Sequence, residues 1–192
     1  PGRKDSGTGG FGLYVQTSLP IPTDRQRSLA SSDLAGLAAV FLRVVDGDDA
    51  SCLNLNRVAR PGILAVDPGA MSGRFAFAGV LGDARPVDPW TLLDRDLGPG
   101  TIPAFVDASV MTWGLGLQLG DEIEYLDEAG RTLKVRLVAG LAGSVFQGSL
   151  LVSEAALLRH FPSTPLHRVM LVETPAGQNA AVAEGLAQSL AT

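Results

Sequence analysis

Charged residues are scarce in this chain: they make up 18% of its 192 residues, whereas hydrophobic residues make up 46%, and the formal net charge is −5. Nucleic-acid binding requires clustered lysine and arginine that displace counterions from phosphates, and the sequence has no basic stripe. A nucleic-acid partner is therefore not expected. The length fits one large domain or two small lobes around a sizeable apolar core.

Cysteine and histidine, which often bind metals or act as nucleophiles, are rare. The one cysteine, Cys52, excludes an internal disulfide framework, and we interpret it as a small buried hydrophobe rather than a nucleophile. The two histidines, His160 and His167, lack the neighbouring cysteine or carboxylate cluster that a zinc site would need. They are expected on the surface near a helix end.

Long apolar runs and hydrolase motifs are missing as well. The longest uncharged run, residues 137–153, is interrupted by glycine, serine and glutamine, so it is not predicted to span a membrane. The G-x-S-x-G pattern of serine hydrolases does not occur. No catalytic, cofactor-binding or metal-binding residues are predicted. An unrecognised hydrolase stays an alternative, which would need titratable groups with shifted pKa values in a cleft.

Two short motifs suggest ligand binding, but their context does not. Residues 7–12 match G-x-G-x-x-G, yet dinucleotide binding needs a strand before the motif and a helix after it. Here a polar stretch precedes the motif, and residues 1–10 are predicted as a flexible tail. Residues 46–49, Asp-Gly-Asp-Asp, lack the glutamate that closes an EF-hand loop, because the twelfth position is Arg57. A turn is preferred there, with a calcium site of another type as the alternative.

The clearest structural pattern is a β-hairpin at residues 122–137. Apolar and charged residues alternate on both sides of a turn, which is typical of a half-buried antiparallel pair. Residues 128–130 fit a three-residue loop whose final glycine has a positive φ. The predicted register places opposite charges face to face on the solvent side: Asp127 with Arg131, Glu124 with Lys134, and Glu122 with Arg136.

Other segments give a mixed pattern of strands and helices. Strands are predicted at residues 11–19, 40–45, 62–66, 150–152 and 168–173, and around Phe75 and Phe77. Helices are predicted at residues 68–72 and 107–113, and after the N-cap residues Asp88, Ser153 and Thr174. Residues 23–32 are predicted as a polar loop and residues 97–103 as a linker.

The last predicted helix has apolar residues four apart, at Val182, Leu186 and Leu190, so it needs a sheet to cover. The last and first strands are the nearest candidates. We therefore predict an α+β fold of two lobes. Residues 11–100 and 163–192 form an α/β lobe from both chain ends, and residues 101–162 form an inserted, mainly-β lobe with short helices.

Three motifs follow one another through the inserted range: Gly-Leu-Gln-Leu-Gly-Asp at 116–121, Val-Ala-Gly at 138–140, and Phe-Gln-Gly-Ser-Leu-Leu-Val-Ser-Glu at 146–154. In this order they resemble the extracytoplasmic (periplasmic core) domain of ABC transporter permeases of the FtsX/MacB type. A fourth motif, Asp-Gly-Asp-Asp-Ala-Ser-Cys-Leu-Asn-Leu-Asn at 46–56, resembles a signature of one bacterial subgroup of such permeases.

The resemblance implies a non-enzymatic, extracytoplasmic domain of a cell-membrane protein that couples cytoplasmic ATP hydrolysis to export or to activation of a partner. The implied partners are the protein's own transmembrane helices, a cytoplasmic ATPase subunit, a second permease copy, and an extracytoplasmic protein or lipid. No cofactor is implied. The membrane helices are expected beyond both ends, so Phe11 and Ala191 should emerge on one side. A soluble or anchored module that binds a ligand or peptide in a cleft between the lobes is the alternative.

Trp113 and Phe146 lie beside glycines in the inserted range. One interpretation is that both fill the core. The other is that they form an exposed apolar patch facing a partner or lipid, which fits the low charge content. They are the candidate partner-facing residues.

Overall fold

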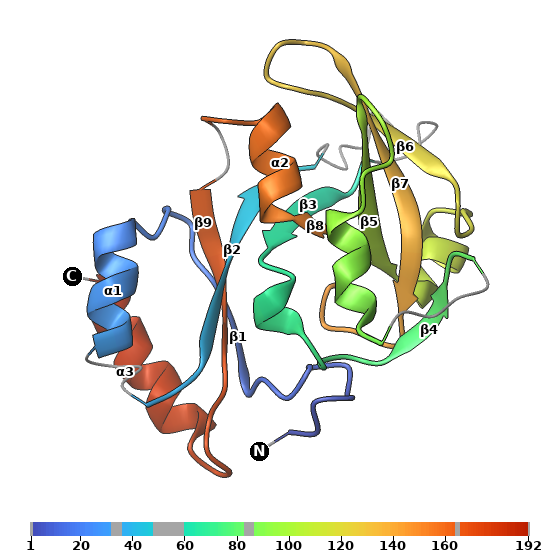
Figure 1. Ribbon diagram of the computed structural model, residues 1–192. Coiled ribbons are helices and arrows are strands. Elements are labelled where there is room, and N and C mark those ends of the chain that lie inside the picture. Colours follow the sequence, from blue (N-terminus) through green and yellow to red (C-terminus); the bar gives the residue numbers. More distant parts are fainter. Residues whose placement is uncertain (1, 32–35, 48–59, 83–86, 164–165, 192) are drawn as a thin grey trace.

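A computed structural model of the chain describes residues 2–31, 36–47, 60–82, 87–163 and 166–191 (Figure 1). It confirms the predicted α+β class, because a large mixed sheet is accompanied by a few short helices. None of the helices in these ranges has the length and apolarity that a membrane crossing requires. Cys52, Asn54, Asn56 and most of the 46–56 motif lie outside the described residues.

One curved, nine-stranded sheet organises the molecule. Its order is β1 (Leu13–Gln16), β9 (Leu166–Val172), β2 (Ala39–Val45), β3 (Gly62–Val66), β8 (Ser149–Ser153), β5 (Thr101–Asp107), β7 (Thr132–Leu141) and β4 (Phe77–Val80), with β6 (Glu122–Leu126) also paired to β7. Most pairs are antiparallel, but β3 runs parallel to β8 and β5 parallel to β7.

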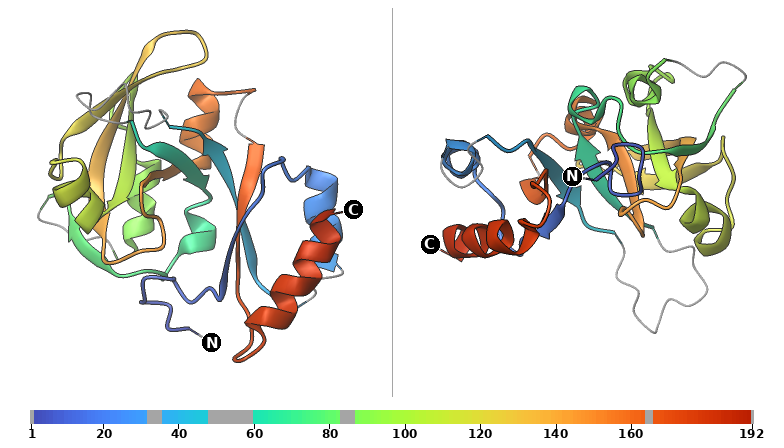
Figure 2. Two further views of the ribbon diagram at one scale, coloured as in Figure 1. Left: turned by 180° about the vertical axis from the view of Figure 1, so that it is seen from behind. Right: turned by 90° about the horizontal axis from the view of Figure 1, so that it is seen from below.

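Helices cover the sheet at separate places. In both figures α1 (Thr23–Ser31) and α3 (Asn179–Ala191) lie together beside β1, β9 and β2, away from the β6–β7 hairpin (Figure 2). The other helices are α2 (Glu154–His160), the 3-10 helices η1 (Gly69–Met71) and η2 (Pro89–Asp94), and the π-helix η3 (Val110–Gly114).

Three apolar clusters form the core. One lies under α1 and α3 and contains Leu29, Met170 and Leu186. The second lies between the β5–β6–β7 part of the sheet and α2, and contains Ile102 and Leu157. The third, which we call the aromatic core, links rings by centroid distances of 5.2–6.5 Å through Phe11, Phe75, Phe77, Trp90, Phe105 and Phe146.

The predicted hairpin is confirmed in register. Glu122 pairs with Arg136 and Glu124 with Lys134, and the amide of Asp127 donates to the carbonyl of Arg131. Gly130 has a φ of +73°, the left-handed conformation that the three-residue loop requires. Local alternation and turn chemistry were therefore sufficient to predict the register of this hairpin.

Two loop predictions were wrong. Residues 23–32 were predicted as a polar loop, but residues 23–31 form α1. Leu29 is the one buried apolar residue among the described side chains of α1, so the sequence has no helical periodicity to detect. Residues 97–103, predicted as a linker, include the start of β5, which lies in the middle of the sheet although Pro103 belongs to it. Phe75 also stands outside its predicted strand, because its φ is +62° and β4 begins at Phe77.

The last helix begins later than predicted but packs as expected. Thr174-Pro175 forms a turn closed by a bond from the Gln178 amide to the Pro175 carbonyl, and α3 starts at Asn179. Leu186 is buried and Val182 and Leu190 pack against the same cluster, which includes residues of β1 and β9. The apolar stripe of α3 is confirmed.

Residues 2–10, predicted as a flexible tail, instead pack on the body of the protein. The Gly7 carbonyl accepts from the Val145 amide at 2.9 Å, and the Lys4 carbonyl accepts from the Phe75 amide at 2.6 Å. The guanidinium of Arg74 donates to the Gly9 carbonyl and lies 4.4 Å from the centre of the Phe11 ring. This segment covers the aromatic core, which composition alone could not indicate.

The two-lobe division stays a prediction. Strands β3 and β8, one from each predicted lobe, pair over five residues, and the aromatic core draws on both ranges.

The chain ends are neither together nor at opposite poles (Figure 1). Asn179 at the start of α3 donates to the Gly12 carbonyl, and the helix then carries the chain away by about 1.5 Å per residue.

Candidate functional site

A buried carboxylate holds the segment that presents Trp113. Asp107, at the end of β5, accepts bonds from the amide and hydroxyl of Ser109 on one oxygen and from the Ser144 amide on the other. Burial raises the pKa of Asp107, but these hydrogen bonds together outweigh burial and hold the pKa below its ordinary value. Asp107 therefore fixes the turn that leads into η3 and ties it to the 142–146 loop.

Trp113 projects from η3 and is 87% exposed. It lies in an uncharged stretch, residues 108–120, which includes three half-buried leucines after Trp113 and ends at Gly120. We call residues 108–120 the Trp113 segment. An indole has a large apolar surface and a polar N–H, which suits it to contacts with proteins and membrane interfaces. The prediction that Trp113 faces a partner therefore stays open.

Phe146 does not share this setting. Its side chain is 2% exposed and contacts Phe75 with a centroid distance of 5.2 Å. The prediction that Phe146 faces a partner was wrong, because the core-filling alternative holds. The N-terminal segment and the rings of the aromatic core enclose it.

The far end of the Trp113 segment is anchored to β4 and β7. The Gly120 amide donates to the Leu137 carbonyl, and Asp121 accepts from the Gln118 amide. A Cβ on Gly79 would lie 3.3 Å from Leu119, and one on Gly120 would lie 3.5 Å from Leu81. The segment is thus held at both ends while its middle stays at the surface.

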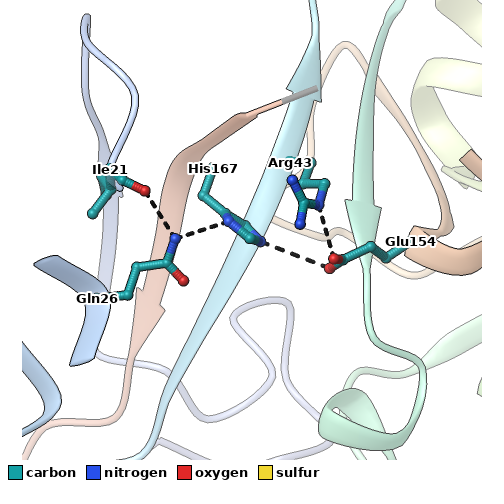
Figure 3. Close-up of polar contacts among 5 residues, drawn as sticks. All are labelled: Ile21, Gln26, Arg43, Glu154 and His167. Carbon is teal, nitrogen blue, oxygen red and sulfur yellow. Dashed lines mark hydrogen bonds and ion pairs between the residues drawn. The ribbon is translucent and has the colours of Figure 1, made fainter. Parts of the chain in front are cut away.

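A polar network lies in another part of the molecule, where four elements meet (Figure 3). The Gln26 amide nitrogen of α1 donates at 2.8 Å to the Ile21 carbonyl and at 2.8 Å to Nδ1 of His167 on β9. Nε2 of His167 lies 3.7 Å from Glu154 of α2, which accepts at 2.8 Å from Arg43 of β2. A register shift after Leu42 places Arg43 opposite His167. The network joins α1 to α2 across two strands.

This network requires a neutral His167. The bond to the Ile21 carbonyl identifies the Gln26 atom as the amide nitrogen, which can only donate hydrogen bonds. Nδ1 of His167 must therefore accept from Gln26, and the ring proton lies on Nε2 toward Glu154. Burial lowers the pKa of His167, Arg43 lowers it further, and Glu154 opposes both. The arrangement contains no nucleophile and no open substrate position, so we assign it a structural role.

The prediction of two surface histidines near a helix end holds only for the helix-end position of His160, because His167 lies within β9 and both side chains are largely buried. His160 lies at the end of α2 with its Nδ1 3.9 Å from the carboxylate of Asp127, which in turn binds the amide and guanidinium of Arg131. Burial lowers the pKa of His160.

Within the described ranges no group of three or more His, Cys, Asp or Glu side chains is placed to hold a metal ion. Asp46 bonds to Arg168, whereas Asp48 and Asp49 lie outside the described residues.

Sequence reasoning missed the polar network and a hollow beside β4 and η2. The network joins residues 111 to 141 positions apart in the chain, so no local pattern could reveal it. The hollow has a volume of about 190 Å³ and is lined by Leu81, Leu92, Arg95, Leu97, Arg136 and Val138. Its residues come from three separate segments, and only the fold brings them together.

No protein-family model matches the chain. No curated protein matches it either. The chain is similar to the crystal structure of the extracellular domain of the noncanonic ABC-type transporter YknZ from Gram-positive bacteria, with a TM-score of 0.42 and 12% sequence identity, over 88% of this chain and 86% of that chain. A match with a TM-score below 0.5 assigns no function to the chain.

Proposed function

We propose that this chain is a non-enzymatic extracytoplasmic domain of an ABC transporter permease of the FtsX/MacB type. The parent protein lies in the cell membrane, and the domain moves with a cytoplasmic ATPase subunit to drive export or to activate a partner outside the membrane. Its other partners are its own transmembrane helices and a second permease copy. An extracytoplasmic protein or lipid is the target on which it acts.

The placement of the three motifs carries this proposal. Residues 116–121 lead into β6, residues 138–140 lie in β7, and residues 146–154 run through β8 to the first residue of α2. Strand β5 lies between β7 and β8 and pairs with both. Motifs that are separate in sequence thus form one structural unit, which also presents Trp113.

The ligand-binding alternative has weaker support. Small-molecule sites usually enclose about 300–1,000 Å³, whereas the hollow beside η2 has about 190 Å³ and one between β1 and β3 has about 140 Å³. Pairing between β3 and β8 also joins the two predicted lobes where a cleft was expected. Neither of these two hollows reaches the usual range.

Sidedness of the full-length protein tests the proposal. We would replace Cys52 by serine, introduce Thr112→Cys at an exposed position, and treat intact cells, or spheroplasts where an outer membrane exists, with a membrane-impermeant maleimide. We expect labelling before lysis and co-purification of an ATP-hydrolysing subunit. The matched control, Ala156→Cys at a buried position, should stay unlabelled until the protein is denatured. Labelling of Thr112→Cys only after lysis would refute an extracytoplasmic location.

A further inference from the structure

The hollow beside β4 and η2 combines an apolar floor with two guanidinium groups. Leu92 and Leu97 are half-buried, Val138 is buried, and Leu81 at the rim is 39% exposed. Arg95 and Arg136 complete the lining.

Among the described residues Arg95 forms no ion pair, although the carboxylates of Asp94 and Asp96 flank it in sequence. Its acidic neighbours in sequence bind elsewhere: Asp94 accepts from the Ser153 hydroxyl at 2.6 Å, and Asp96 accepts from the Gly98 amide at 2.9 Å. Within the described part of the chain the Arg95 guanidinium has no ion-pair or hydrogen-bond partner. Arg136, by contrast, is paired with Glu122. Arg95 therefore supplies the available positive charge.

We propose that this hollow binds one aliphatic side chain of a partner protein, with a neighbouring carboxylate of the same segment bound by Arg95. A volume of about 190 Å³ accepts a single large side chain but not a long acyl chain. The apolar floor favours burial of an aliphatic side chain, and a guanidinium binds a carboxylate through charge-assisted hydrogen bonds. The partner segment therefore carries leucine, isoleucine, valine or methionine beside aspartate or glutamate.

The hollow adjoins the C-terminal end of the Trp113 segment. Leu81 lines the hollow and lies 3.5 Å from the position that a Cβ on Gly120 would take. The inference goes beyond the permease proposal and does not depend on it, because the hollow belongs to this chain in any cellular context.

Binding of a defined peptide pair tests the inference. The probe is acetyl-Gly-Ser-Leu-Glu-Gly-Ser-amide, and its control replaces glutamate by glutamine. Titration into the isotope-labelled chain should shift the backbone amide resonances of Leu81, Leu97 and Val138, with a dissociation constant in the millimolar range. The control peptide should bind about threefold more weakly, as expected for one exposed ion pair.

Two variants assign the effect to Arg95. Arg95→Gln should remove the difference between the two peptides, whereas Arg159→Gln, at an exposed position on α2, should preserve it. The proposal would be overturned if Arg95→Gln left the difference between the two peptides unchanged. It would also be overturned if the peptide, added at several millimolar, shifted no resonances. Binding to phosphatidylglycerol vesicles that Arg95→Gln abolishes, without peptide binding, would assign the hollow to a membrane and also overturn it.

Discussion

Phe146 and Trp113 are both aromatic residues in apolar stretches of the chain, yet the structure encloses Phe146 and exposes Trp113. Residues 2–10 cover the aromatic core through bonds to positions about 70 and 140 residues along the chain. No comparable cover from the described residues lies over Trp113, which is 87% exposed. Burial of an aromatic side chain is thus decided by distant segments rather than by its neighbours in sequence.

Truncating the two aromatic side chains should give the largest contrast. Phe146→Ala would leave a cavity in the aromatic core and lower the unfolding free energy by about 3–5 kcal/mol. Trp113→Ala should change it by less than about 0.5 kcal/mol, because the side chain is exposed. Urea unfolding of both variants measures this difference. Equal losses would show that Trp113 is buried in the folded protein.

Gly7→Ala tests the cover over the aromatic core. An added Cβ would lie 1.9 Å from the Gly143 carbonyl oxygen, so the N-terminal segment would have to move. We expect a loss of about 2 kcal/mol, as for overpacking of a tight contact. Gly114→Ala, whose Cβ would meet Val110 at an ordinary 3.6 Å, is the control in the Trp113 segment. A neutral Gly7→Ala would restore the flexible-tail prediction.

Much of the fold could be predicted from sequence where the determinants are local. The hairpin register follows from charge alternation and Gly130, and the start of η2 follows from Asp88, whose side chain accepts from the Trp90 amide. Helix α1 could not be predicted, because Leu29 is its one buried anchor and meets residues of distant strands. For the same reason sequence identified Trp113 as a candidate but could neither exclude Phe146 nor find the hollow at Arg95.

Two glycine substitutions compare the hairpin turn with the middle of α3. Gly130→Val should destabilise the protein by about 1 kcal/mol or more, since no atom crowds the site but a β-branched residue resists a φ of +73°. Gly185→Ala, in the middle of α3 with open space around it, should stabilise by about 0.5–1 kcal/mol. Melting temperatures that move in the same direction would contradict the bulged turn.

The polar network should add a pH dependence that the Trp113 segment lacks. The folded-state pKa of His167 is lowered by burial, so below its ordinary pKa of about 6.5 the unfolded chain binds protons that the folded chain does not. The unfolding free energy should therefore fall as the pH drops from 6.5 toward 5, above the range of the carboxylates. His167→Gln should reduce this fall by about 1 kcal/mol or less, and Trp113→Ala should not change it. An unaltered slope in His167→Gln would contradict the neutral histidine.

The proposal that this domain moves with an ATPase, and the prediction that Trp113 faces a partner, can be tested together with one cysteine. In membrane vesicles that hold the full-length Cys52→Ser protein and its ATPase subunit, the rate of maleimide labelling of Trp113→Cys would be measured with and without ATP and vanadate. We predict that ATP changes this rate while the rate for Gln188→Cys, an exposed position on α3, stays constant. The same rate for Trp113→Cys in both nucleotide states would contradict the proposal.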